Sequence, residues 1–516
     1  MTAPFHHGCC FVITPEPFQL VLTLIGRDVT PSFAIHRSGL RAWNQIPWLA
    51  MVSSCPHEAF QAADLKSLRS SVVSGQTRPE AWRRQQLKRF SDLLDRHEAE
   101  ILEALRIDLA KPELEGMFEI VALLQELKVT RRRLKAWMRP RRIPVPIAQQ
   151  PGRAQLIREP LGCVLVIGPW NYPFMLTLQP LISALAAGNT VVLKPSEHAP
   201  AAAALITRLI TEGFPSDVVR VVNGDGSTAA ALVDLGFDHI FFTGGGAIGA
   251  KVLAGAARHL TPVTLELGGK NPAVVLDGAD LAVTARRLIW GKGVNAGQTC
   301  IAPDHLLVQT SIRQRLVEAL REERRKLYGD DPIASADLSS LIHDRHFQHL
   351  EGLLATARAE GRVLFGGECD RQSRKIAPTL IEVHSDQDPL MAEEIFGPLL
   401  PMLTVDTLDS AITRIQQQDK PLAIYLFGGD HNDQREVLQR TSSGGVCFND
   451  VVMQKGVPEL PFGGVGPSGM GSYHAETGFQ TFSHERSVLS RPFFPDIRLR
   501  YPPYSLNPAL FRRLVG

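Results

Sequence analysis

Short apolar runs that alternate with helical stretches restrict the fold of this chain more than any other feature. The runs begin after Leu161 and are rich in β-branched residues. A first set comprises Val164–Ile167, Thr190–Leu193, Val218–Val222 and Ile240–Phe242, and a second set comprises Ala273–Leu276, Leu306–Val308, Leu399–Val405 and Ala423–Phe427. Continuous apolar strands separated by helices are typical of parallel sheets that are covered on both faces. The pattern therefore predicts an α/β fold with two successive α/β domains and a cleft between them.

Composition limits the class of protein. The chain has 516 residues, of which 44% are hydrophobic, and 55 Lys and Arg against 53 Asp and Glu leave a net charge of +2. No basic excess indicates a nucleic-acid partner. The seven cysteines are irregularly spaced and do not suggest a disulfide framework, and no motif suggests a metal site. The apolar run Phe18–Ile25 is too short for a bilayer, which needs about 20 residues, so we expect a cytoplasmic protein.

The first part of the chain differs from the rest. Residues 1–70 lack sustained periodicity, which predicts an N-terminal extension that is either flexible or lies upstream of the true start. Thr77–Glu80 has the form of a capping box and is predicted to begin a helix. A second helix is expected over Phe118–Trp137. The Pro-rich stretch Arg139–Arg158 that follows is predicted to form a pair of extended arms.

Two residues could take part directly in covalent chemistry. Cys300 lies in a polar, glycine-containing loop after a predicted helix, where a thiol could act as a nucleophile if its surroundings favour the thiolate. A cysteine taken alone is more often a small buried hydrophobic residue. Glu266 ends an apolar run and precedes two glycines, so it is a candidate general base. A strand-end carboxylate satisfied by loop amides is an equally good interpretation.

Two strand-end motifs are candidates for nucleotide binding. The glycines from Gly244 to Gly249 follow a strand and open a helix, where backbone N–H groups and the helix dipole would suit a pyrophosphate. Their spacing departs from the usual dinucleotide fingerprint, and a tight packing turn is the alternative. Lys194 and Glu197 also follow a strand and could contact a ribose. The alternative there is a simple helix start capped by Ser196.

Three further side chains come from polar loops. Asn171 follows the strand Val164–Ile167, and its amide could donate to an oxyanion, although most such asparagines only satisfy the turn. Glu394 and Phe396 belong to a segment of paired acids with a Gly-Pro stop, for which a solvated face is the alternative. Because ligands bind at strand-end loops of α/β sheets, these motifs together indicate one binding site.

Taken together, the motifs resemble those of the NAD(P)-dependent aldehyde dehydrogenase superfamily, and most closely its class 3 group. The matching segments occur in the family's order and cover about residues 74–490. They are PWNYPF, VVLKPSE, FTGGGAIG, VTLELGGKNP, NAGQTC, EEIFGP and PFGGVGPSGMGSYH. The resemblance implies a Rossmann-like cofactor-binding domain (71–140 and 160–264), a catalytic domain (265–465) and β-arms for oligomerisation (141–159 and 466–505).

The resemblance also implies roles for individual residues. Cys300 would be the nucleophile, Glu266 the base that activates the deacylating water, and Asn171 an oxyanion donor alongside the backbone N–H of Cys300. The remaining positions would bind NAD or NADP. Lys194 and Glu197 would hold the adenosine ribose, and Gly244 to Gly249 would lie near the pyrophosphate. Glu394 and Phe396 would position the nicotinamide riboside. Trp170 is also expected to be a cofactor-binding residue.

The implied activity is oxidation of an aldehyde to the carboxylic acid, with a medium- or long-chain aliphatic or aromatic substrate and a homodimeric enzyme. Gly245 and Gly246 stand where the family often has hydroxyl residues, which leaves the choice between NAD and NADP open. Two alternatives remain at this point. One is a CoA-acylating aldehyde dehydrogenase, against which Glu266 argues, and the other is a catalytically silent binding protein on the same fold.

Overall fold

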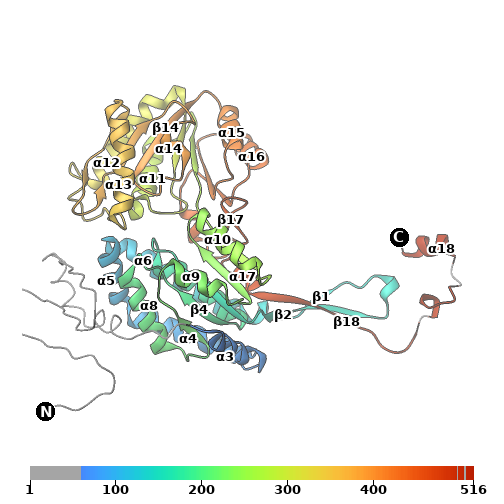
Figure 1. Cartoon of the computed structure of the whole chain (residues 1–516). Coiled ribbons are helices and arrows are strands. Elements are labelled where there is room, and N and C mark those ends of the chain that lie inside the picture. Colours follow the sequence, from blue (N-terminus) through green and yellow to red (C-terminus); the bar gives the residue numbers. More distant parts are fainter. Residues whose placement is uncertain (1–59, 497, 505–506, 516) are drawn as a thin grey trace, which may run out of the picture. The chain divides into compact units, whose positions relative to one another are not determined.

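The computed structural model describes residues 60–496, 498–504 and 507–515, and its helices and strands are labelled in Figure 1. In the part of the chain that the structure describes, four helices precede the first strand: α3 (Ala62–Val73), α4 (Glu80–Arg96), α5 (Glu98–Leu109) and α6 (Glu113–Trp137). The sheets that follow confirm the α/β fold class. Among the described residues, no helix is long and apolar enough to cross a membrane.

The first large sheet has six strands in the order β17-β7-β6-β3-β4-β5. All neighbouring pairs are parallel except β17 with β7. Its strands are β3 (Cys163–Ile167), β4 (Thr190–Lys194), β5 (Val219–Val221), β6 (His239–Thr243), β7 (Val263–Glu266) and β17 (Gly469–Met470). The helices connecting them are α7 (Pro173–Ala187), α8 (Pro200–Gly213), α9 (Gly226–Val233) and α10 (Gly246–Ala257).

The second large sheet has seven strands in the order β10-β13-β14-β9-β8-β15-β16, and only β10 with β13 is antiparallel. The strands are β8 (Pro272–Val275), β9 (His305–Gln309), β10 (Val363–Phe365), β13 (Thr379–Glu382), β14 (Leu399–Val405), β15 (Ala423–Phe427) and β16 (Gly445–Phe448). The helices are α11 (Leu281–Gly293), α12 (Arg313–Tyr328), α13 (Asp344–Ala359), α14 (Pro389–Ala392), α15 (Leu408–Gln417) and α16 (His431–Arg440), with a small hairpin of β11 (Cys369–Asp370) and β12 (Lys375–Ile376).

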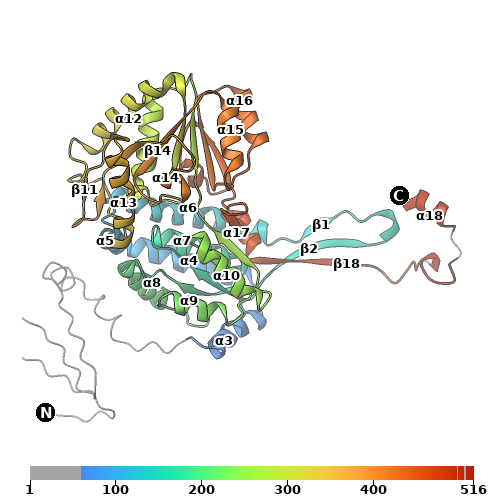
Figure 2. The same cartoon turned by 45° about the horizontal axis from the view of Figure 1, so that its top comes forward.

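A third, narrow sheet forms a ribbon, seen in Figures 1 and 2, from β1 (Arg141–Ile143), β2 (Arg153–Pro160) and β18 (Ser483–Ser490). Both neighbouring pairs are antiparallel, and β18 pairs with β2 along its whole length. Two more α-helices are described, α17 (Ala475–Thr481) and α18 (Pro508–Val515), and short 3-10 helices lie in several of the connections. The predicted extended arms are therefore present as strands.

The arm predicted over residues 466–505 is divided. Its first part returns to the six-stranded sheet, because β17 pairs with β7 and α17 packs on α6 and α7. Glycine makes the close approach possible: Gly469 has a φ of 152°, and a Cβ there would lie 2.5 Å from the carbonyl oxygen of Leu265. Only β18 joins the ribbon, so the ribbon is shorter than predicted.

The folded chain also begins earlier than predicted. Helix α3 lies largely within the predicted extension 1–70, yet Leu65 and Leu68 are buried against β3 and β6 in one hydrophobic cluster. The Thr190 hydroxyl donates to the carbonyl oxygen of Leu68 at 3.1 Å. An amphipathic helix with a short apolar stripe can thus belong to the core although its sequence shows little periodicity. Residues 1–59 of the predicted extension lie outside the described residues.

The strand order of the first sheet predicts where a ligand would bind. From β3 the chain moves outward through β4 to β5, and then returns to the other side of β3 for β6 and β7. The loops after β3 and β6 therefore leave the sheet in opposite directions from adjacent strands. In open α/β sheets, ligands bind at such a reversal, outside the carboxyl ends of the strands.

We predict that Leu68→Ala lowers the free energy of unfolding by about 2–5 kcal/mol, because truncating a fully buried leucine leaves a cavity. Chemical denaturation followed by circular dichroism measures the change. Lys66→Ala, at an exposed position of the same helix, is the control and should alter stability little. Equal, small effects of both substitutions would show that α3 is not part of the folded core.

Candidate active site

A pocket of about 250 Å³ opens at this reversal point. The carboxyl ends of β3, β6 and β7 contribute one part of its wall, and loops associated with the seven-stranded sheet contribute the other. Its lining residues are Pro169, Trp170, Asn171, Leu176, Thr243, Gly244, Gly245, Glu266, Leu267, Gly268, Cys300, Glu394, Phe396, Phe462 and Tyr473. Segments separated by about 300 residues of sequence therefore meet around one cavity.

The pocket brings together most of the residues that were singled out in the sequence. The three candidates for chemistry, Cys300, Glu266 and Asn171, all line it, as do Trp170, Gly244, Glu394 and Phe396. Two of these are also packed together, since the rings of Trp170 and Phe396 meet edge to face with their centroids 5.4 Å apart.

Three of the singled-out residues do not line the pocket. Lys194 ends β4, next to β3, and forms an ion pair with Glu197. Gly249 lies inside α10, where a Cβ would come within 2.8 Å of Leu267 Cδ2. For Gly249 the packing interpretation therefore fits best, because its small size allows α10 to approach the loop after β7.

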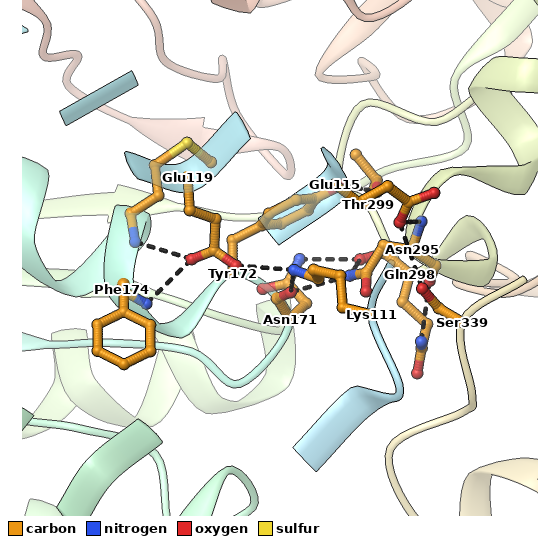
Figure 3. A network of polar contacts seen from close by, with 11 residues as sticks. Lys111, Glu115, Glu119, Asn171, Tyr172, Phe174, Asn295, Gln298, Thr299 and Ser339 are labelled. Carbon is orange, nitrogen blue, oxygen red and sulfur yellow. Dashed lines mark hydrogen bonds and ion pairs between the residues drawn. The ribbon is translucent and has the colours of Figure 1, made fainter. Parts of the chain in front are cut away.

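Asn171 is held by its backbone as well as its side chain (Figure 3). Its carbonyl oxygen accepts hydrogen bonds from Lys111 Nζ at 3.1 Å and from Asn295 Nδ2 at 2.9 Å. Its own side-chain Nδ2 donates to the carbonyl oxygen of Gln298 at 3.1 Å. An asparagine amide has two N–H donors, so one donor fixes the side chain and the second is left for another acceptor.

The loop that carries Cys300 is fixed by the same network. Asn295 and Ala296 both have a φ of 52°, a left-handed conformation that is costly for residues other than glycine. Gln298 offsets this cost by donating to the carbonyl oxygen of Ser340 at 3.0 Å and accepting from the N–H of Ile342 at 2.9 Å. These bonds hold the backbone immediately before the thiol in one conformation.

Two more hydrogen bonds flank the thiol itself. The hydroxyls of Tyr172 and Thr299 are 2.7 Å apart, and Asn271 Nδ2 donates to the carbonyl oxygen of Cys300 at 2.8 Å. Tyr172 follows Asn171 directly, so a single turn after β3 supports both the amide and the cysteine loop.

A buried ion pair supports the start of α7 (Figure 3). Lys111 Nζ lies 2.7 Å from Glu119 Oε1, and both side chains are fully buried. The other oxygen of Glu119 accepts from the backbone N–H groups of Phe174 and Met175 at 3.0 and 2.9 Å. The carboxylate thus satisfies two N–H groups that have no partner within the helix, and it stabilises the turn that positions Asn171.

Glu266 is buried with no hydrogen-bond partner for either carboxylate oxygen among the described residues. Burial raises its pKa well above the usual value, and Lys455 opposes that shift. Burial likewise raises the pKa of Cys300 to about 12, with a further increase from Glu394. Glu394 is affected in the same way, because burial and, to a smaller extent, the negative charge of the nearby Asp304 raise its pKa to about 8. The pocket therefore disfavours negative charge unless a cation or donor offsets burial.

The turn between β6 and α10 has the features of an anion site. Gly245 is the N-cap of this 12-residue helix, and no side chain caps the helix end. A Cβ at Gly245 or Gly246 would meet nothing within 4 Å. Open space beside an uncapped helix N-terminus suits a phosphate group. No group of residues that could hold a metal ion occurs in the described part of the chain.

Several residues of the site carried no usable signal of their own. Lys111 acts through partners that are distant in sequence, and Lys455 lies in a segment without a motif. Tyr172, Phe462 and Tyr473 could have been found, since the first belongs to PWNYPF and the other two to PFGGVGPSGMGSYH, both segments of the resemblance.

Comparison with known proteins identifies the family of this chain. The profile of the family described as "Aldehyde dehydrogenase family" matches residues 52–488. The chain belongs to the aldehyde dehydrogenase family. Aldehyde dehydrogenase family 3 member H1 of Arabidopsis thaliana is 46% identical over 441 residues, which cover 85% of this chain and 91% of that protein. This relative confirms the predicted resemblance to the class 3 group, whose members are named family 3.

Two further relatives extend the comparison. The dimeric NADP-preferring aldehyde dehydrogenase of Canis lupus familiaris is 43% identical over 439 residues, covering 84% of this chain and 96% of that one. Among solved structures, the substrate-bound state of Staphylococcus aureus AldH has a TM-score of 0.85 at 39% identity, covering 88% of this chain and 99% of that chain.

We predict that Lys111→Met lowers the free energy of unfolding by about 3–5 kcal/mol, because it leaves the Glu119 carboxylate buried without its cation. Urea denaturation measures the change. The double variant with Glu119→Gln should recover part of the loss. Lys128→Met, which removes an exposed charge from α6, is the matched control. A loss no larger than that of the control would contradict a structural role for the ion pair.

Proposed function

We propose that this aldehyde dehydrogenase oxidises an aldehyde to the carboxylic acid with NAD or NADP, using Cys300 as the nucleophile. The observation that carries the proposal is the meeting of Cys300, Asn171 and Glu266 around one pocket. Family membership gives the reaction class, and the pocket supports an assignment of each side chain to a step.

The first step is attack of the Cys300 sulfur on the aldehyde carbon, which places negative charge on the former carbonyl oxygen. Asn171 can stabilise that charge with its second N–H, because its first N–H is held by Gln298. The backbone N–H of Cys300 is the other proposed donor. Donors fixed in advance lower the barrier because they need not reorganise during the reaction.

A bound nicotinamide cofactor would supply the hydride acceptor that converts the adduct on Cys300 to a thioester. Glu266 then acts as the general base: its carboxylate takes a proton from water, and the resulting nucleophile releases the carboxylic acid and the free thiol. A carboxylate with a raised pKa is a stronger base than one in water. This position of Glu266 favours hydrolysis over transfer of the acyl group to CoA.

The structure offers suitable surroundings for the cofactor. The uncapped start of α10 at Gly244 to Gly246 would bind the pyrophosphate. Lys194 and Glu197 would hold the adenosine ribose from the end of β4, next to the pocket strand β3. Glu197 would repel a 2′-phosphate by its charge, although one relative is named NADP-preferring. We therefore retain both cofactors.

The other cofactor contacts are proposed for residues of the pocket wall. Glu394 and Phe396 would position the nicotinamide riboside, and Trp170, packed on Phe396, would support it. Gly249 would contribute by allowing α10 to pack closely, without touching the cofactor. In these terms, the six-stranded sheet belongs to the cofactor-binding domain and the seven-stranded sheet to the catalytic domain.

Substrate class and assembly are proposed on coarser grounds. The aromatic and aliphatic side chains of Leu176, Phe462 and Tyr473 in the pocket wall suit a medium- or long-chain aliphatic or aromatic aldehyde. The ribbon of β1, β2 and β18 is the proposed contact in a homodimer, the state named for one relative. A cytoplasmic location is proposed from the sequence.

We predict that Cys300→Ser lowers NAD(P)H formation by more than about a thousandfold, because the nucleophile of the covalent route is lost. Absorbance at 340 nm measures the rate across aldehydes of increasing chain length, with each cofactor in turn. Cys369→Ser, at a cysteine outside the pocket, is the control and should retain activity. Aldehyde oxidation by Cys300→Ser at the wild-type rate would refute the assignment.

A further inference from the structure

Lys455 lies beside the pocket in a position that the proposed reaction does not yet use. It belongs to the short 3-10 helix Met453–Gly456, which follows β16. Its Nζ lies 3.0 Å from Gln179 Oε1 and 2.8 Å from His474 Nε2. These two acceptors come from α7 and from the residue before α17, so the ammonium is held by parts of the first domain although its own segment follows the second sheet.

Two aromatic rings enclose the same ammonium. Nζ lies 4.9 Å from the ring centroid of Phe462 and 5.4 Å from that of Tyr473. Both rings also line the pocket that contains Cys300 and Glu266. Lys455 is therefore behind an aromatic part of the pocket wall, close enough for its charge to act on the pocket through a medium of low dielectric constant.

The charge of Lys455 has no direct counterion in the described residues. Within the described part of the chain its Nζ forms no ion pair with a carboxylate, and its two hydrogen-bond partners are an amide and an imidazole. Burial, together with the charge of Lys455, lowers the pKa of His474 well below its usual value, so the neutral ring accepts a hydrogen bond from the ammonium through Nε2. An enclosed ammonium with neutral partners is costly unless anions nearby compensate.

The acidic groups near Lys455 are two of the pocket and one glutamate on α6. Glu126 accepts from the backbone N–H of Ala475 at 2.7 Å and from Gln179 Nε2 at 3.4 Å. Glu266 and Cys300 complete the set. Burial lowers the pKa of Lys455 to about 8, and Cys300, Glu126 and Glu266 oppose that shift. The interaction is reciprocal, because Lys455 favours the ionised forms of all three groups.

We infer that Lys455 is a positioning residue of the reaction, whose fixed positive charge stabilises the Cys300 thiolate and the Glu266 carboxylate across the aromatic wall. The inference rests on the proposed function and adds a residue to it. Glu394 acts in the opposite direction, since its negative charge disfavours the thiolate. The pocket thus combines one cation with two groups that must be anionic to react.

The test measures the reactivity of Cys300 without aldehyde or cofactor. The full-length protein is alkylated at about pH 7.5 with neutral iodoacetamide and, separately, with anionic iodoacetate, and mass spectrometry of the Cys300 peptide gives both rate constants. Because alkylation needs no dehydrogenase turnover, failure of this inference is distinguishable from failure of the proposed function, which the Cys300→Ser assay tests.

In Lys455→Met we expect the iodoacetamide rate at Cys300 to fall at least about threefold. Losing a nearby cation raises the thiol pKa by about one unit or more, so less of the thiol is ionised. The thiolate of a thiol with a higher pKa is more nucleophilic, and this offsets part of the loss. The ratio of the iodoacetate rate to the iodoacetamide rate should also fall, because an anionic reagent is no longer attracted. Lys455→Arg, which keeps the charge, should retain both values within about twofold.

Two further variants keep the result interpretable. Lys455→Gln removes the charge but keeps a hydrogen-bond donor, and it should behave like Lys455→Met even if the methionine variant folds poorly. Lys128→Met removes an exposed charge from α6 and should leave both rates unchanged. Wild-type rates and ratio in the Met or Gln variants would overturn the inference. So would an equal loss in the Arg variant, because packing rather than charge would then be responsible.

Discussion

The carbonyl oxygen of Asn171 is the point at which the two halves of the site are joined. It accepts from Lys111 on one side and from Asn295 on the other, while the Asn171 side chain is tied to Gln298. The turn after β3 and the strained loop before Cys300 therefore cannot move independently. Because catalysis by an oxyanion donor depends on distances set before the substrate arrives, this buried network is the condition for the proposed chemistry.

Burial of the pocket has two opposite effects on the proposed chemistry. Removing water strengthens each electrostatic interaction but raises the pKa of Glu266 and Cys300, the two groups that must lose a proton in the proposed reaction. Only a few groups of the fold can offset this effect of burial. Asn171 offers a neutral donor, Lys455 lies behind Phe462 and Tyr473, and the uncapped start of α10 is the proposed site of the cofactor's pyrophosphate. We therefore expect the reactivity of this site to depend on the positive charge near the thiol, and not on the thiol alone.

The sequence could predict the sheets, and it could place the candidate residues at strand ends, because both depend on local patterns; the roles of those residues rest on the family resemblance and remain a proposal. Strands buried on both faces read as apolar runs, and Cys300, Glu266 and Asn171 each stand where such a run or its helix ends. Other predictions failed where distant contacts decide. The predicted capping box at Thr77–Glu80 is wrong: Pro79 occupies the N-cap position of α4 without a side-chain cap, and the buried Thr77 hydroxyl has no hydrogen-bond partner in the described chain. Lys111 and Lys455 were missed because their partners lie far away in sequence.

The most direct measurement of the division of labour between Cys300 and Glu266 is the intact mass of a Glu266→Gln variant after mixing with an aldehyde and NAD or NADP. If Glu266 activates the hydrolytic water, acylation continues while deacylation slows, so the protein should gain the mass of one acyl group, located by peptide mapping on Cys300. The same variant carrying Cys300→Ser should gain none. Turnover of Glu266→Gln at the wild-type rate, or an acyl group on a different residue, would contradict the proposed mechanism.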